Sequence, residues 1–580
     1  MNLPEFLRAV DAATAKLTPE QLAGCIHQQA RRLPEEDRAA FLRSLQTGQP
    51  EEVAVEPAVP DIAALLDSLR RIAAGELCLT GELNEAYDDW YGDEEEYLIE
   101  DPHDIAGTVR QAMDAVHQYV DSEAYDDALC IGQMLLELSI TVGGEYLDYS
   151  DEPFGIDDLD RYDMLPDYEA LLRRLYVDML TAAYFHCPGE ERCTRIFELF
   201  DSYRRQNALK LEEVLAKSSR ELPDMSGFLT QWTDYLGEKT GQTADRLIAE
   251  AVRLSGNGKA WHTAARRFAN THPGLYEQLL RENPNALEDH RLLSIGQEAL
   301  RAIPPDLQLR SRVALLTAEY ALRLDDRSEA ERCWLEALRS EPNATNYLRF
   351  SVESRDIPRA LEAARGICGQ YHADGQSSGE AYGYDRAENA PFEMNRAIRC
   401  SLAFLERDFD YVQKRGMAVK QGLGWSSTFT NAGLSLFLLY LYQGETLDKG
   451  MYWLCTRAAL DMGFDAERYC DGLVQKAEEG TEECFWRVFH VWRAHHGCGE
   501  QEQAELLLEM ERLVDLRLDG IMSANRRNYY AECAAYVAGL AEVKASRGEA
   551  SGKQEVLQAY KARYSRRRAF HEELRRFGMT

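Results

Sequence analysis

The clearest structural unit in the sequence is ALLTAEYALRLDDRSEAERCWLEALRSEP, residues 314–342. Apolar residues recur every three to four positions on both sides of the polar turn at 325–327, which is typical of two amphipathic helices. The second half carries a spaced set: Ala330, Trp334, Ala337 and Pro342. The alanines allow two helices to touch, the tryptophan fills the groove between them, and the proline ends the helix. We therefore predict a helical hairpin.

This spacing resembles the second helix of a tetratricopeptide repeat. Weaker versions of the pattern follow Tyr125, Asp356 and Gly444, at intervals that are not constant. From Asp61 onward nearly every segment combines helical apolar spacing with a short polar break, and strand signals are scarce. We predict an all-α fold: an irregular TPR-like helical-repeat solenoid with a small N-terminal helical unit. An irregular helical bundle containing one chance match is the alternative.

The composition along the chain suggests five parts. We expect a small N-terminal helical unit at 1–46, a Pro-rich linker at 47–60, an acidic helical-repeat region at 61–290, a TPR-like helical-repeat region at 291–550, and basic C-terminal capping helices at 551–580. The linker, TGQPEEVAVEPAVP, has three prolines and no helical period, which favours an extended connection.

The charge of the chain is concentrated in one region. Asp and Glu number 99 against 65 Lys and Arg, a net charge of -34, and residues 51–200 alone contribute -29. Such a charge repels nucleic acid and anionic membranes, which argues against broad docking on either. The acids belong mainly to two tracts, residues 84–104 and 145–163, in which Tyr and Trp alternate with carboxylates.

Aromatic residues mixed with carboxylates are typical of a surface that selects a basic partner. We predict a non-enzymatic scaffold or adaptor that binds a basic protein or peptide there. The expected contacts are Tyr87, Asp88, Asp89, Trp90, Tyr91 and Asp93. The alternative interpretation is a pair of solvated loops whose acids only keep the protein soluble. Calcium is not expected, because Pro153 stands where a loop that begins at Asp148 would need glycine.

The last segment of the chain has the opposite charge. Residues 551–580 hold eight bases and three acids, with a patch formed by Arg563, Arg566, Arg567, Arg568, Arg575 and Arg576. A basic run of this kind permits a nucleic-acid-associated regulator, although the acidic remainder of the chain makes nucleic acid an unfavourable partner. Because Phe570, Leu574 and Phe577 accompany the arginines, a capping helix with one solvated face is the simpler interpretation. The patch could also close onto the acidic tracts or recruit an acidic partner.

Motifs for catalysis and cofactor binding fail on inspection. The sequence GNGKA at 256–260 lacks the hydroxyl and the first glycine of a phosphate-binding loop, and no GxSxG or HExxH occurs. His495, His496 and Cys498 lie together without the paired CxxC spacing of a zinc site. We expect no enzyme, metal or cofactor, while an enzyme whose site is not recognisable from sequence stays open.

The compartment follows from three negative signals. The first eight residues, MNLPEFLR, lack a secretory n-region and apolar core, and the apolar stretch at 431–444 is too short to span a bilayer. The 13 cysteines are scattered, as in a reducing compartment. We expect a cytoplasmic protein.

Two stretches, 294–350 and 516–578, resemble a helical-repeat region of uncharacterised bacterial proteins, some of which carry a SWIM-type zinc finger. The CxCx(n)CxH pattern of that finger is absent from this sequence. The resemblance therefore implies a helical interaction region, and it implies neither zinc nor catalytic residues.

Overall fold

The computed structural model describes residues 61–578 except 84–96, 145, 147–151, 218–221, 256–257, 284–285, 374–390, 425, 475–478 and 549–551. The predicted N-terminal unit at 1–46 and the linker at 47–60 lie outside the described residues. The chain divides into two compact units, Met1–Trp261 and His262–Thr580. The boundary falls within helix α14 (Gly258–Arg267). The five sequence-based ranges stay predictions.

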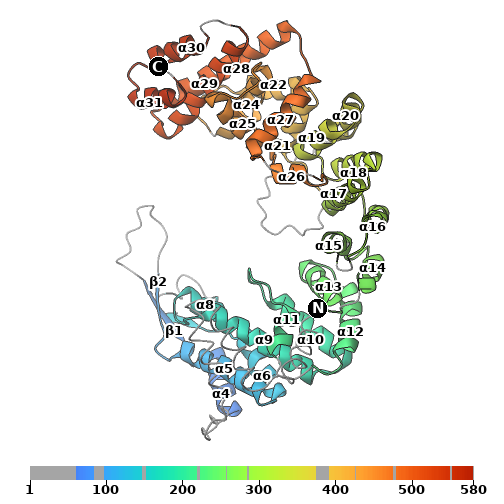
Figure 1. Cartoon of the computed structure of the whole chain (residues 1–580). Helices are drawn as coiled ribbons and strands as arrows, with labels where there is room; N and C mark the ends of the chain where they lie inside the picture. The colour runs from blue at the N-terminus through green and yellow to red at the C-terminus, as the bar shows by residue number, and fades with distance from the viewer. Residues whose placement is uncertain are drawn as a thin grey trace, which may run out of the picture. The chain divides into compact units, whose positions relative to one another are not determined.

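Unit 1 contains helices and one small sheet (Figure 1). Its described elements are α4 (Ile62–Ala73), β1 (Leu79–Leu83), β2 (Tyr97–Glu100), α5 (Ile105–Asp121), α6 (Tyr125–Leu136), β3 (Val142–Gly144), α8 (Ile156–Arg161), α9 (Tyr168–His186), α10 (Gly189–Ser202), α11 (Leu211–Lys217), α12 (Met225–Gly237) and α13 (Gln242–Leu254).

Helix α9 is the centre of unit 1. It contacts α5, α6, α10 and α11, so it is covered on several sides. Apolar residues follow nearly its whole circumference, from Leu171 and Leu172 to Ala182 and Ala183, and all of these are buried. A helix that is hydrophobic all round has to lie inside the protein, which explains its position.

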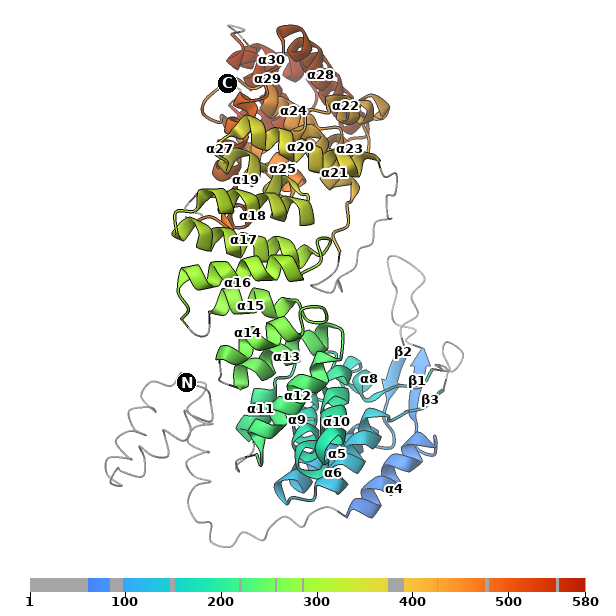
Figure 2. The ribbon, with the colours of Figure 1, turned by 90° about the vertical axis from the view of Figure 1, so that its right-hand side faces the viewer.

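The sheet of unit 1 was not predicted from the sequence. Its strands have the order β2-β1-β3, with β1 antiparallel to β2 and parallel to β3. The strand sequences LTGEL, YLIE and VGG are short and lack a β-branched alternation, so they give no strand signal. Hydrogen bonding between segments distant in sequence forms this sheet; Figure 2 shows it beside α4 and α8.

Unit 2 contains helices throughout its described residues. They are α15 (Gly274–Glu282), α16 (Asp289–Ala302), α17 (Gln308–Arg323), α18 (Arg327–Ser340), α19 (Ala344–Glu353), α20 (Ile357–Ala373), α21 (Arg396–Leu405), α22 (Phe409–Ala418), α23 (Ser426–Asn431), α24 (Leu434–Leu441), α25 (Lys449–Met462), α26 (Ala466–Cys470), α27 (Thr481–Ala494), α28 (Glu500–Ser523), the 3-10 helix η1 (Arg527–Tyr529), α29 (Tyr530–Ser546), α30 (Gly552–Arg563) and α31 (Arg568–Arg576).

The predicted hairpin is confirmed as α17 and α18. Ala330, Trp334 and Ala337 are fully buried. The Asp326 carboxylate accepts a hydrogen bond from the Glu329 backbone N–H, at 3.1 Å, and so caps the start of α18. Helix α18 ends at Ser340, before Pro342. Helices α15 to α20 pack mainly on neighbours in sequence (Figure 1), as repeats do.

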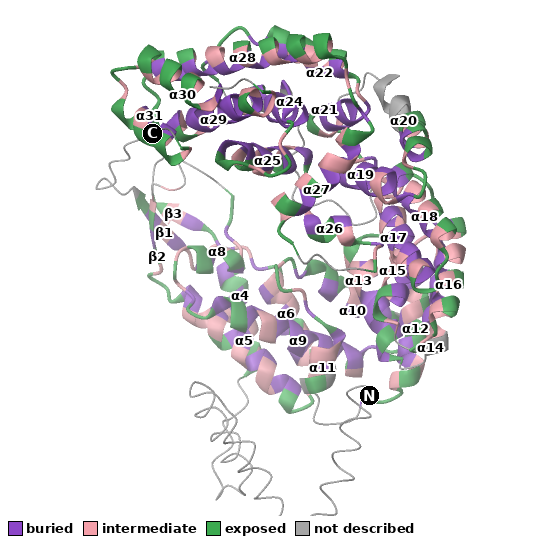
Figure 3. Ribbon diagram, turned by 45° about the horizontal axis from the view of Figure 1, so that its top comes forward, coloured by how far each residue is buried: buried purple, intermediate pink, exposed green. Residues whose placement is uncertain are grey.

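Beyond α20 the packing becomes irregular. Helix α24 contacts α28 and α29, α25 contacts α27 and α29, and α19 contacts α26 and α27. Helices α24 and α29 are mostly purple in Figure 3, because the other helices cover them. The apolar stretch at 431–444, which is too short to span a bilayer, contains this buried helix α24. Gly450 of α25 meets the Gly539 backbone so closely that an added Cβ would lie 2.6 Å from its nitrogen.

The fold is an all-α helical-repeat solenoid with irregular helix pairs and one small sheet. Within the described part of the chain, no helix combines the length and the apolar character needed to cross a membrane.

Candidate interaction surfaces

The sheet of unit 1 brings the two acidic tracts together. The first tract begins directly after β1 and contains β2, and the second begins directly after β3. Because β1 and β3 are parallel, with Leu79 opposite Val142 and Gly81 opposite Gly144, the chain leaves both strands at the same edge. The predicted contacts from Tyr87 to Asp93 lie outside the described residues.

Aromatic residues of the two tracts pack on each other. The ring centroids of Tyr97 and Tyr146 are 5.3 Å apart, and those of Tyr146 and Phe154 are 5.5 Å apart, both edge to face. Tyr162 stacks on Phe154 at 5.3 Å. Gly81 lies beneath Tyr146, where any Cβ would be 2.7 Å from the tyrosine Cβ. These aromatics therefore hold the tracts together, a role that sequence reasoning missed.

Several carboxylates of the tracts also have structural partners. Asp101 accepts hydrogen bonds from the Ile105 and Ala106 N–H groups, each at 2.8 Å, and so caps the start of α5. Asp157 accepts a 2.6 Å hydrogen bond from the Arg205 guanidinium. These carboxylates are therefore engaged in hydrogen bonds within the fold.

Other carboxylates face away from the aromatic cluster. Glu82 and Glu100 are exposed, and Leu98 between them is 58% exposed. Glu82 lies opposite Leu98 in the register of β1 and β2, and successive side chains of a strand alternate between faces. These three side chains therefore form one face, which we call the acidic sheet face. Among the described residues neither glutamate has an ion-pair partner.

The basic C-terminal patch is divided between structural and exposed arginines. Arg563 donates to Asp515 at 2.8 Å and to Asp519 at 2.6 Å, both on α28. Arg567 donates to Asn525, at 2.5 Å, and to the Met522 carbonyl.

The remaining arginines of the patch differ in their contacts. Arg576 forms an ion pair with Glu573 at 2.8 Å. Arg566, Arg568 and Arg575 are exposed, with no hydrogen-bond or ion-pair partner among the described residues. Phe570 and Leu574 are fully buried, and α31 packs on α29. Two of the six predicted arginines, Arg563 and Arg567, thus fasten the last helices to the unit.

The cysteines and histidines singled out from the sequence do not converge. Within the described ranges no group of three or more His, Cys, Asp or Glu side chains is placed to hold a metal ion. His496 is buried, and its Nδ1 lies 2.9 Å from the Trp492 carbonyl oxygen. Burial lowers the pKa of this histidine.

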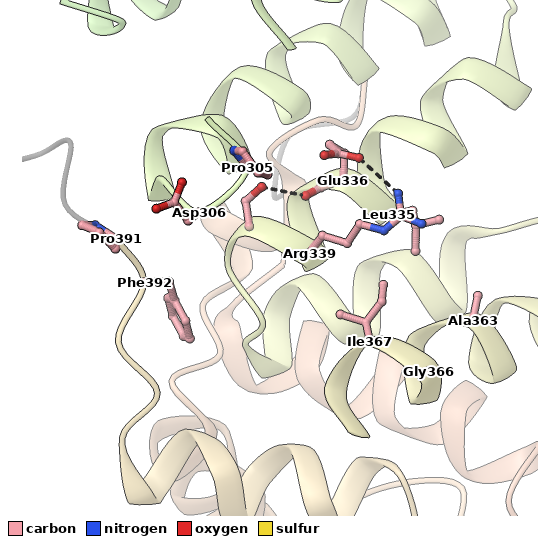
Figure 4. Close-up of a pocket in the computed structure, with 11 residues that line it drawn as sticks. Pro305, Asp306, Leu335, Glu336, Arg339, Ala363, Gly366, Ile367, Pro391 and Phe392 are labelled. Carbon is pink, nitrogen blue, oxygen red and sulfur yellow. Dashed lines mark hydrogen bonds and ion pairs between the residues drawn. The ribbon is translucent and has the colours of Figure 1, made fainter. Parts of the chain in front are cut away.

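A pocket in unit 2 was not foreseen. It has a volume of about 640 Å³ and lies between α18, α20, the loop before α17 and the residues Pro391 and Phe392 (Figure 4). Leu335 and Arg339 share one face of α18, and Ala363, Gly366 and Ile367 share one face of α20, because residues three or four apart in a helix are neighbours. A glycine in the middle of α20 was the one signal in the sequence.

No protein-family model and no curated protein matches this chain. The predicted resemblance to proteins with a SWIM-type finger is therefore without support from a family match. Among solved structures, the chain is similar to a "circular tandem repeat protein with novel repeat topology and enhanced subunit contact surfaces". The match has 13% identity and a TM-score of 0.19, and it covers 95% of each chain.

Proposed function

We propose that this protein is a non-enzymatic scaffold whose acidic sheet face binds a basic, extended segment of a protein partner. The observation that carries the proposal is the arrangement of Glu82, Leu98 and Glu100 on one face of β1 and β2: an exposed leucine beside two carboxylates that have no ion-pair partner among the described residues. Helical-repeat proteins commonly bind partners through extended surfaces, which is compatible with a scaffold role.

The position of β2 supports strand addition as the binding mode. β2 is the terminal strand in the order β2-β1-β3, so among the described residues no strand pairs with its outer edge. An edge strand presents free N–H and C=O groups, to which an extended peptide can add by backbone hydrogen bonds.

The side chains of the acidic sheet face define the partner's pattern. An added strand would place an apolar residue opposite Leu98 and, two residues away on the same face, a lysine or arginine opposite Glu100. The charge of -29 in residues 51–200 would attract the same kind of partner at longer range. Binding should weaken as salt rises, because exposed charges are screened.

A defined probe tests this proposal without a known partner. A short labelled peptide that repeats Val-Ser-Lys-Ser, so that Val and Lys lie two residues apart on one face, is titrated with the full chain, and fluorescence anisotropy is followed at low and at high salt. We expect the Leu98→Ser, Glu100→Gln double variant to bind about tenfold more weakly, equivalent to about 1.4 kcal/mol. N-methylation of alternate peptide nitrogens should remove binding, because a strand needs those donors.

The matched control is the double variant Leu508→Ser, Glu505→Gln on α28, where the leucine is 66% exposed and the glutamate is also exposed. It should bind like the unchanged protein. Equal affinity of both double variants, or equal binding of the same peptide with Glu in place of Lys, would refute the proposal. The predicted contacts Asp88, Asp89 and Asp93 can be changed to Asn and measured with the same probe.

A further inference from the structure

The pocket of unit 2 has apolar walls that are only partly covered. Leu335 of α18, Ile367 of α20 and Phe392 are half-buried, so each presents apolar surface to the pocket. Gly366 has no atom within 4 Å of an added Cβ, so the wall of α20 is open at this residue. These surfaces would gain from burying one bulky apolar side chain.

A donor group lies on the α18 side of the pocket. The Glu336 carboxylate accepts from Arg310 on one oxygen, at 2.8 Å, and from Arg339 Nη1 on the other, at 3.2 Å. Arg339 is 53% exposed, and a guanidinium has five N–H donors, so most of its donors stay available. The glutamate holds Arg339 in place while leaving it able to bind an acceptor.

An acceptor group lies on the opposite side. Asp306 is exposed, and its carboxylate has no hydrogen-bond or ion-pair partner among the described residues. In the view of Figure 4, Asp306 stands with Pro391 and Phe392 on one side of the pocket, while Leu335 and Ile367 stand on the other. A ligand in the pocket therefore meets the Asp306 carboxylate as an acceptor, the apolar walls described above, and the Arg339 guanidinium as a donor.

The chain itself shows how extended backbone fits at this rim. Leu307 and Pro391 form an antiparallel bridge, and the Phe392 N–H donates to the Asp306 carbonyl at 3.3 Å. The rim thus already accommodates one extended segment with an aromatic side chain turned to the pocket. A peptide carries both a donor and an acceptor on every residue, whereas an acyl chain carries neither.

We infer that this pocket is a second binding site, separate from the acidic sheet face, for an extended peptide with an aromatic or branched aliphatic anchor next to a lysine or arginine. The anchor would lie against Leu335 and Ile367. The basic side chain would pair with Asp306, and a peptide carbonyl would accept from Arg339.

A peptide array probed with the full chain tests the inference. The array combines Phe, Leu or Ala as the anchor with Lys, Glu or Ser on either side. We expect the strongest signal from a Phe or Leu anchor beside Lys. Gly366→Trp fills the open wall and should reduce binding of that peptide at least tenfold, while Asp306→Asn should abolish the preference for Lys over Ser.

The control is Glu362→Trp, an exposed position of α20 that does not line the pocket. It should leave binding unchanged. Equal signals from Phe, Leu and Ala anchors would overturn the inference, as would equal binding by Gly366→Trp and the unchanged chain, or displacement of the peptide by a soluble fatty acid alone. If Gly366→Trp does not fold, Asp306→Asn is the test, and an unchanged preference for Lys over Ser in that variant would overturn the inference. The effects of Gly366→Trp and Asp306→Asn do not depend on the acidic sheet face, because both substitutions lie in the pocket.

Discussion

Replacing Arg517 by Met should cause a large loss of stability in unit 2. The side chain is fully buried, and its Nε donates to the Glu532 carboxylate at 2.9 Å. Its Nη1 donates to the carbonyls of Gly422, at 3.2 Å, and Gly424, at 2.8 Å. One guanidinium thus joins α28, α29 and the loop before α23.

The expected magnitude follows from what the substitution leaves behind. Glu532 is only 14% exposed, so it becomes a nearly buried carboxylate without its cation. Removing one partner of a buried ion pair costs about 3–5 kcal/mol, because the remaining charge has lost its compensation. Met has a similar length and stays apolar, so lost packing adds little to this cost.

A double-mutant cycle separates the ion pair from its surroundings. Glu532→Gln alone leaves the arginine without its anion, and the double variant Arg517→Met, Glu532→Gln leaves neither charge. We expect the double variant to be more stable than the sum of the single losses predicts, by about 1–3 kcal/mol. Arg526→Met is the control, because Arg526 is exposed and should change stability by less than about 0.5 kcal/mol.

Two measurements check the cycle. Urea denaturation gives the free energy of unfolding, and hydrogen exchange followed by mass spectrometry shows whether the loss lies in α28 and α29. The reasoning is wrong if Arg517→Met costs less than about 1 kcal/mol, or if the two single losses simply add.

Three further predictions concern other parts of unit 2. In Gly450→Ala the new Cβ would press on the Gly539 backbone, so the free energy of unfolding in urea should fall by about 1–3 kcal/mol. In Gly366→Ala the new Cβ meets open space, so the free energy of unfolding should rise by about 0.5–1 kcal/mol. Equal effects of the two substitutions would contradict the close approach of α25 and α29. Trp334→Phe removes the 3.0 Å hydrogen bond from Nε1 to the Gly472 carbonyl, so calorimetry should show about 1–3 kcal/mol of destabilisation, and an unchanged melting temperature would exclude that bond. The hydrogen bond from Arg266 is the main reason why the pKa of Glu298 falls to about 2, below its unfolded value, so the ionised carboxylate stabilises the fold at neutral pH and this stabilisation is lost as pH falls from about 5 toward 2. The loss of unfolding free energy caused by Glu298→Gln, measured in urea, should therefore shrink over that range. A loss that stays constant with pH would refute the charge effect.

The site could be predicted only in part, because its members are separated in sequence. Composition located the acidic, aromatic-rich region, and the basic C-terminal patch was visible as a charge run. The pairing of β1 with β3, which joins residue 79 to residue 142, has no local signal. The pocket likewise has no local signal, because it depends on the hydrogen bond between the Phe392 N–H and the Asp306 carbonyl, two residues that are 86 positions apart in the sequence.

Local sequence was sufficient to predict an all-α fold and the hairpin formed by α17 and α18, because apolar periodicity, caps and proline act within a few residues of each other. The α17–α18 groove illustrates the limit: Trp334 was predictable as its filler, but its partner Gly472 lies 138 residues away. Tertiary packing decided which arginines fasten α28 and which charged groups stay exposed. Burial and hydrogen bonding depend on what packs against each residue, and that is a property of contacts between distant segments rather than of local sequence.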